Sequence, residues 1–149
     1  MGTAVKDFFT SEEQEVIKQA IRNAELDTSG EIRVHLENSC SGEVLDRAAF
    51  IFKHLGMNKT ELRNGVLIYL AVKDHLFAII GDKGMHKVVP EYFWDEIKAG
   101  MLANFRENRF ARGLTEAIIT TGVQLKKHFP RQDNDINELP DDISFGEGK

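Results

Sequence analysis

The chain has 149 residues, of which 42% are hydrophobic and 29% charged, with a formal net charge of −5. This length and composition are typical of one globular domain with a hydrophobic core. The single cysteine excludes an internal disulfide. No apolar run approaches the roughly 20 residues that span a bilayer, so no membrane span is expected.

The acidic charge is concentrated near the C-terminus. Residues 130–149 hold six acidic and two basic residues, a net charge of −4, which leaves −1 for residues 1–129. Because no basic surplus is present to contact phosphates, nucleic acid is not an expected partner. The first residues, MGTAVKDFF, lack the apolar core of a secretory signal, so we expect a cytoplasmic location. We expect an α/β domain over residues 1–129 and an acidic, partly disordered tail over residues 130–149.

A helix is predicted after Thr10, because Thr10 and Glu13 form a capping-box pattern. The apolar residues that follow recur at helical spacing: Val16, Ile17, Ala20, Ile21 and Ala24. Gly30 is a natural stop for this helix. Residues 31–36 then alternate between polar and apolar side chains, which predicts a strand with one apolar face.

A second helix is predicted over residues 43–55. Its expected buried face is Leu45, Ala48, Ala49, Phe52 and Leu55. Residues 65–72 are almost continuously apolar, which favours a strand buried on both faces of a sheet. A short polar break separates them from a second apolar run, residues 76–80, so the two form a hairpin. The strand–helix–strand order before the hairpin makes the first two strands parallel neighbours.

Two more helices are predicted after the hairpin. The third begins at Pro90, which suits the first position of a helix. Its buried side is Phe93 or Trp94, Ile97, Met101 and Phe105. The fourth covers residues 109–129. These elements predict a three-layer α/β/α sandwich: a mixed central sheet of three or four strands with four main helices.

Four polar residues are predicted to meet at one edge of the sheet. The third strand runs backwards, so its exit at Asp82 lies beside Asn64, where the second strand starts, and beside Glu31, where the first strand starts. Glu91 follows one loop later. Oxygen ligands of this kind suit calcium or magnesium, which would be weakly bound. Ordinary turn, helix-capping and solvated roles for the same residues remain open alternatives.

Several short motifs, taken in order, resemble the TPM domain family. Ser29-Gly30 precedes the first strand, Asn64-Gly65 opens the second, and Gly81 and Gly84 bracket the turn after the third. Glu91 stands where the family has an aspartate. The later family segment is matched by Phe105-Arg106, Phe110 and Gly113-Leu114, with Asn108 where glycine is usual.

The resemblance carries expectations of its own. The family includes a thylakoid-lumen protein of photosystem II repair and many bacterial proteins. Membership implies an α/β/α sandwich, phosphatase activity as in some members, and divalent-cation binding as in others. This chain looks like the short bacterial type. It has one extra residue in the Gly81–Gly84 turn and glutamate in place of aspartate at position 91.

Other chemistries find little support in the sequence. Cysteine phosphatases need Cys-x5-Arg, but Arg47 is seven positions after Cys40. The five histidines form no i,i+4 pair, so no helical zinc site is indicated. Two function classes remain. The first is a non-catalytic interaction or repair-type module whose expected partners are a divalent cation and a protein. The second is a weak, metal-dependent phosphatase acting on phosphate monoesters.

Overall fold

The structure is a computed structural model that describes residues 5–131 and 143–146. Four helices are long: α1 (Ser11–Glu25), α2 (Val44–His54), α4 (Glu91–Arg106) and α5 (Phe110–His128). The shorter ones are η1 (Val5–Asp7), η2 (Met57–Lys59) and α3 (Lys83–His86). The strands are β1 (Glu31–Glu37), β2 (Gly65–Ala71), β3 (Leu76–Gly81) and β4 (Ile143–Phe145).

The four strands form one mixed sheet in the order β3-β2-β1-β4. β1 and β2 are parallel, with Glu31 paired to Gly65, and β2 and β3 form the expected antiparallel hairpin. β4 pairs parallel with the outer edge of β1. The strand–helix–strand order therefore has the predicted topology, and the sheet reaches its fourth strand through the C-terminal segment.

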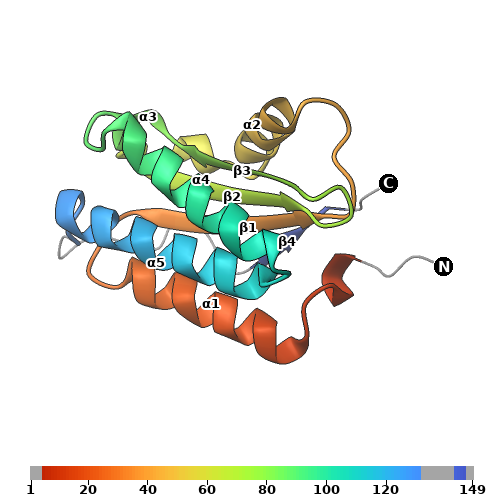
Figure 1. Cartoon of the computed structure of the whole chain (residues 1–149). Helices are drawn as coiled ribbons and strands as arrows, with labels where there is room; N and C mark the ends of the chain where they lie inside the picture. The colour runs from red at the N-terminus through yellow and green to blue at the C-terminus, as the bar shows by residue number, and fades with distance from the viewer. Residues whose placement is uncertain (1–4, 132–142, 147–149) are drawn as a thin grey trace.

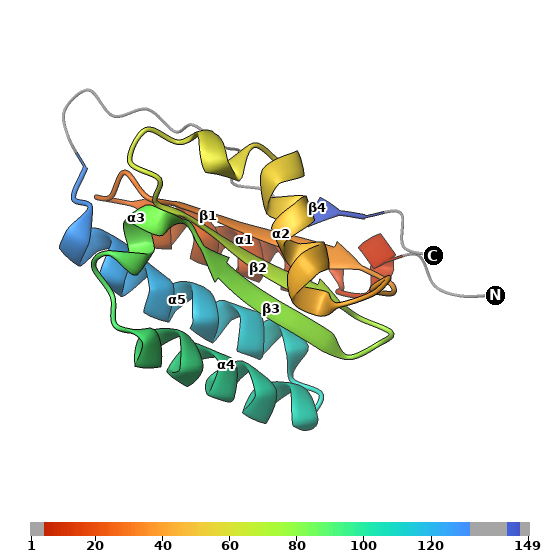
Figure 2. The ribbon, with the colours of Figure 1, turned by 90° about the horizontal axis from the view of Figure 1, so that it is seen from above.

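Helices cover both faces of the sheet, which confirms the three-layer sandwich (Figure 1). One face packs against α1, α4 and α5, through strand residues such as Ile32 and Ile68. The other face packs against α2 and η2, through residues such as Leu67 and Tyr69. Seen from above, α2 lies across one side of the sheet and α4 and α5 lie on the other (Figure 2). β2 lies between both layers, and all seven of its residues are buried.

Two helix faces differ from the predicted ones. In α2, Leu45 is 50% exposed and Ile51 is buried, so the buried stripe lies about one residue further round the helix. In α1, Val16 is 54% exposed although it follows the apolar spacing. Both helices carry more apolar residues than one stripe can bury, and spacing alone does not decide which of them faces the sheet.

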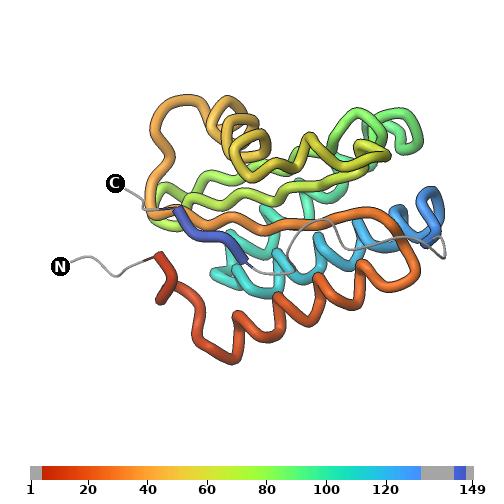
Figure 3. Tube along the Cα trace, turned by 180° about the vertical axis from the view of Figure 1, so that it is seen from behind, coloured from red at the N-terminus to blue at the C-terminus, as the bar shows by residue number. Residues whose placement is uncertain are grey.

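The folded domain extends past the predicted boundary at residue 129. Ile143 in β4 is buried and joins the core on the α1 side of the sheet. The amide of Gly146 donates to the Leu36 carbonyl at 2.8 Å. Figure 3 shows β4 beside β1. One apolar side chain and the free edge of β1 are thus enough to hold three residues of an acidic segment, whereas residues 132–142 and 147–149 of the predicted tail lie outside the described residues.

The double burial of β2 gives a direct test of the layers. Leu67 and Ile68 point to opposite faces of the sheet, and both are fully buried. We expect Leu67→Ala and Ile68→Ala each to lower the free energy of unfolding by roughly 2–5 kcal/mol. Leu45→Ala on exposed α2 surface is the control, with an effect within about 0.5 kcal/mol. Urea unfolding measures all three, and a near-neutral result at residue 67 or 68 would contradict coverage of that face.

Candidate functional site

Three of the four predicted cation ligands lie at the edge of the sheet where β1 and β2 start and β3 ends, which is called the rim below. Glu31 is paired with Gly65, and the Asp82 amide donates to the Gly65 carbonyl at 2.9 Å. Positions 31, 65 and 82 therefore form one row across three strands. Since facing residues of paired strands point to the same side, Glu31 and Asp82 lie on the α2 face, with a glycine between them. Both carboxylates are largely buried, at 2% and 7% exposure.

The third strand-end residue, Asn64, contacts the segment before β1. It is 1% exposed, and its Nδ2 donates to Ser29 Oγ at 3.3 Å. The Ser-Gly and Asn-Gly motifs are therefore in direct contact, although they are 35 residues apart in the chain. Their side chains join the starts of the two parallel strands.

The Asp82 carboxylate is bound by an arginine. Arg63 Nε donates to Oδ2 at 2.7 Å, and an Arg63 terminal nitrogen donates to Oδ1 at 3.0 Å. The amide of Lys83 donates to Oδ1 at 2.8 Å, because Asp82 is also the N-cap of α3. The hydrogen bond to Asp82 raises the pKa of Arg63. The rim thus holds its own counter-cation, which the sequence pattern did not reveal.

The two glycines of the turn have packing roles. A Cβ at Gly84 would lie 2.3 Å from the Leu62 carbonyl oxygen, and one at Gly81 would lie 2.4 Å from the Trp94 ring. The Gly84 amide donates to the Arg63 carbonyl at 2.8 Å, and Arg63 has a φ of 53°, which is uncommon outside glycine. The turn is therefore pressed against the residue that binds Asp82.

Glu91 is separated from the other three residues. It lies in the first turn of α4, is exposed, and lines a cavity of about 330 Å³ with Gly81, His86 and Trp94. Gly81 faces α4, so Asp82, the next residue, points to the opposite side of the sheet. Within residues 5–131 and 143–146, no group of three or more His, Cys, Asp or Glu side chains could hold one metal ion. The expected four-residue cluster is not assembled, and cation binding itself remains a prediction.

A second polar cluster lies at the other end of β1. Glu37 is 2% exposed, and its Oε1 accepts hydrogen bonds from Tyr69 Oη at 2.6 Å and Arg47 Nε at 2.9 Å. Its Oε2 accepts from an Arg47 terminal nitrogen at 2.5 Å. A buried carboxylate is costly without such partners, and here three donors compensate it. β1, β2 and α2 each supply one member.

His35 extends this cluster to the C-terminal strand. It is 4% exposed, its Nδ1 lies 2.7 Å from Ser144 Oγ, and its Nε2 lies 3.5 Å from Glu37 Oε2. The backbone of Gly146 packs on the same carboxylate, since a Cβ there would lie 2.3 Å from Oε2. β4 therefore covers a buried histidine and a buried glutamate with one hydroxyl and one glycine.

The environment shifts four pKa values in this cluster, including that of Arg47, which the hydrogen bond to Glu37 raises. Burial alone would raise the pKa of Glu37, but the hydrogen bonds from Arg47 and Tyr69 outweigh it and lower the pKa to about 2. Burial lowers the pKa of His35, with Glu37 acting in the opposite direction. Burial and the hydrogen bond to Glu37 raise the pKa of Tyr69. The glutamate is therefore held as an anion.

A cleft of about 590 Å³ opens beside this cluster. It is lined by parts of β1, α2, β4 and the loop between β1 and α2: His35, Glu37, Ser39, Ser41, Arg47, Phe50, Ile51, His54, Leu55, Ser144, Phe145 and Gly146. Glu37 and Arg47 are absent from the predicted site, because no motif or spacing in the sequence connects them. One signal for this second cluster is present in β1. Every second residue of β1 is polar, although helices cover both faces of the sheet.

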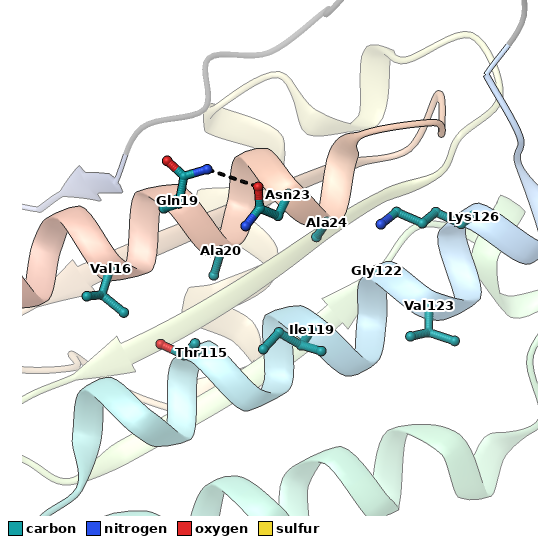
Figure 4. A pocket seen from close by; sticks show the side chains of 10 residues that line it. All are labelled: Val16, Gln19, Ala20, Asn23, Ala24, Thr115, Ile119, Gly122, Val123 and Lys126. Atoms are coloured by element: carbon teal, nitrogen blue, oxygen red, sulfur yellow. Dashed lines mark hydrogen bonds between the residues drawn. The ribbon is translucent and has the colours of Figure 1, made fainter.

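A shallower groove of about 390 Å³ lies between α1 and α5. Gly122 allows the close approach of these helices, since a Cβ there would lie 2.6 Å from the Ala24 Cβ. Figure 4 shows Val16, Ile119 and Val123 along the groove. Their exposed fractions are 54–59%. This lining is mainly apolar, and it supplies no cluster of reactive groups.

These features define a small α/β/α sandwich with polar residues gathered at both ends of its first strand. The TPM domain profile matches residues 3–123, so the chain belongs to the TPM domain family. This membership confirms the resemblance seen in the motifs. A search of curated proteins gives no match.

Solved bacterial structures share the fold. The NMR structure of the BA42 protein from the psychrophilic bacterium Bizionia argentinensis is 47% identical, with a TM-score of 0.88, and the match covers 95% of this chain and 98% of that chain. The N-terminal domain of a P. gingivalis protein is 18% identical, with a TM-score of 0.70 and coverage of 85% and 83%. The N-terminal domain of the cg2496 protein from Corynebacterium glutamicum is 14% identical, with a TM-score of 0.64, and the match covers 79% of this chain and 74% of that chain.

One of the location expectations can be compared with the structure. No helix in the described part of the chain is long and apolar enough to cross a membrane. The cytoplasmic location remains a prediction.

The shifted pKa values predict how stability depends on pH. Folded Glu37 has a pKa of about 2, below its ordinary 4.5, so its contribution is present above pH 4.5 and lost as the pH falls toward 2. His35 acts in the same direction below pH 6.5, because the unfolded chain takes up the proton first. We expect the free energy of unfolding to fall steadily from pH 7 toward pH 2.

Glu37→Gln isolates the glutamate. We expect it to be less stable than the wild type by about 3 kcal/mol at pH 7, with the difference vanishing near pH 2. Urea unfolding of both proteins at each pH measures this difference. A pH-independent difference would mean that the charge of Glu37 does not stabilise the fold.

Proposed function

We propose that this TPM domain is a non-catalytic binding module whose rim takes a divalent cation, calcium or magnesium, weakly, through Asp82 and Glu31, while Asn64 joins the starts of the two parallel strands beside them. The observation that supports the proposal is the row of residues 31, 65 and 82 across three strands. Two buried carboxylates face the same side there, and the residue between them is a glycine. Carboxylates held near one another favour a cation at that place.

Arg63 sets the strength of this binding. Its guanidinium lies 2.7 Å from Asp82, so the added cation competes with a charge that the protein already supplies. The Arg63 side chain is 36% exposed, whereas that of Asp82 is 7% exposed, so the pair is partly buried. A bound cation must therefore displace a guanidinium that donates two hydrogen bonds to Asp82. An affinity on the order of 10⁻⁴–10⁻³ M, as in loosely built calcium modules, follows from this competition.

Glu91 is left outside the ligand set. It lines a cavity on the α4 side of β3, whereas Asp82 points to the α2 side. Its carboxylate adds negative charge near the rim and no direct ligand. The contrast between positions 82 and 91 makes Glu91→Gln a matched control for Asp82→Asn, since each change removes one negative charge.

A calcium titration of the ¹⁵N-labelled protein tests the proposal through the backbone amide shifts. In the wild type we expect the changes to centre on residues 30–31, 63–65 and 81–84. Asp82→Asn should abolish most of them, and Glu91→Gln should leave the affinity within about twofold. Magnesium, titrated in the same way, shows which cation binds more tightly.

Arg63→Gln provides the sharpest test. A unit charge at about 4 Å changes the energy of a divalent ion by about 2 kcal/mol even at the dielectric constant of water, so this variant should bind calcium about 30-fold more tightly. Arg112→Gln, which breaks the exposed Arg112–Glu116 pair, is the control and should bind like the wild type. Unchanged affinity in Arg63→Gln, or shifts confined to residues 130–149, would contradict a rim site.

The phosphatase alternative rests on the family resemblance. Turnover of a generic phosphate monoester by the purified protein, with and without magnesium, is compared with that of Asp82→Asn. The module proposed here requires that the two preparations show the same background rate. A rate that depends on magnesium and is lost in Asp82→Asn would favour the phosphatase instead.

A further inference from the structure

The outer edge of β1 is covered by a very short strand. Within the described residues, β4 pairs with β1 at Val34–Leu36, three residues, whereas β1 has seven. β4 is an edge strand, and peripheral elements of a fold can open without global unfolding.

The contacts of β4 are nevertheless specific, and they follow a residue pattern. Ile143 enters the core, Ser144 Oγ lies 2.7 Å from His35 Nδ1, and Gly146 leaves no room for a side chain above Glu37. Four successive positions along β1 thus accept, in order, an aliphatic residue, a residue with a hydroxyl group, any residue, and glycine. Backbone pairing with pockets for alternate side chains is how sheet edges recognise extended peptides.

Of the two β1 residues beneath β4, Glu37 keeps its hydrogen bonds without β4, whereas His35 is bonded to Ser144 of β4. Glu37 is held by Arg47 and Tyr69, which belong to α2 and β2. The 590 Å³ cleft continues the same edge, and Phe50 at its mouth is 57% exposed. A longer peptide could follow the edge and also place a side chain in this cleft. A partly preformed floor and an adjoining cleft suit a peptide-binding groove.

We propose that the edge of β1, with His35 and Glu37 as its floor, is a groove for an extended segment of a partner protein, and that β4 is an internal copy of that ligand which the partner displaces. The segment runs parallel to β1 and carries an aliphatic residue, serine or threonine, any residue, and glycine. This groove lies at the opposite end of β1 from the rim, and the inference does not depend on cation binding.

Hydrogen exchange of the full wild-type chain tests whether β4 can leave. The Gly146 amide, bonded to the Leu36 carbonyl, should exchange at least about 100-fold faster than the Tyr69 amide in the centre of β2. Exchange of Gly146 at the rate of the core would overturn the proposal, because β4 would then leave only on global unfolding.

Peptide addition tests the groove itself. The protein is a ¹⁵N-labelled Gly146→Val chain, in which β4 should detach while the core signals persist. The probe is a synthetic peptide with the sequence of residues 138–149. We expect it to restore the wild-type shifts of His35 and Leu36, and the same peptide with Gly146→Val to bind at least about tenfold more weakly. The intact wild-type chain should also bind the probe at least about tenfold more weakly, because its own β4 competes.

Three results would overturn the proposal. The two peptides could bind equally, which would remove the glycine requirement. The Gly146→Val chain could unfold, which would make β4 an integral part of the fold. It could also elute as a dimer that keeps the β4 contacts, which would make a second copy the occupant. Ser144→Ala is a milder variant in which the probe should bind more tightly than to the wild type, and unchanged binding there counts against the role of His35.

Discussion

The complete burial of β2 is the constraint on which the rest of this structure depends. A strand with no exposed residue needs a paired strand on each side and a helical layer on each face. β1 and β3 supply the strands, α1, α4 and α5 supply one layer, and α2 with η2 supplies the other. Because β1 lies next to β2 within the same layers, its polar residues Glu31, His35 and Glu37 are buried too, and each needs a compensating partner.

Each of the two polar clusters contains a carboxylate that is paired with an arginine. At one end of β1 the row that includes Glu31 holds Asp82, which is paired with Arg63. At the other end Glu37 is paired with Arg47. In each case an arginine from a neighbouring segment reaches a carboxylate on the α2 face. Forked guanidinium–carboxylate pairs fix geometry as well as charge, so these arginines position the loop before β2 and helix α2.

Periodicity and turn residues predicted most of the fold because they report local physics. The capping box at Thr10 and the apolar run of β2 have their expected structures, whereas the segment predicted as a glycine-bracketed turn contains the start of helix α3. α3 and β4 were not predicted, because each is held mainly by contacts from distant segments. The rim was half predicted: strand order aligned positions 31, 65 and 82, whereas side-chain direction, which turned Glu91 away, depends on register.

The second cluster could not be read from the sequence for a related reason. Glu37, Arg47, Tyr69 and Ser144 come from four separate elements, and no spacing connects them. What the sequence does contain is a conflict: alternate polar residues in a strand that helices cover on both faces. Local sequence patterns that disagree with the global fold are expected at functional sites and at sites of backbone or side-chain strain. In β1 this conflict is resolved at Glu37 by Arg47 from α2 and Tyr69 from β2. At His35 it is resolved by the hydroxyl group of Ser144 in β4. His35, which has the single hydroxyl partner, is therefore the member of the network that depends on the edge strand.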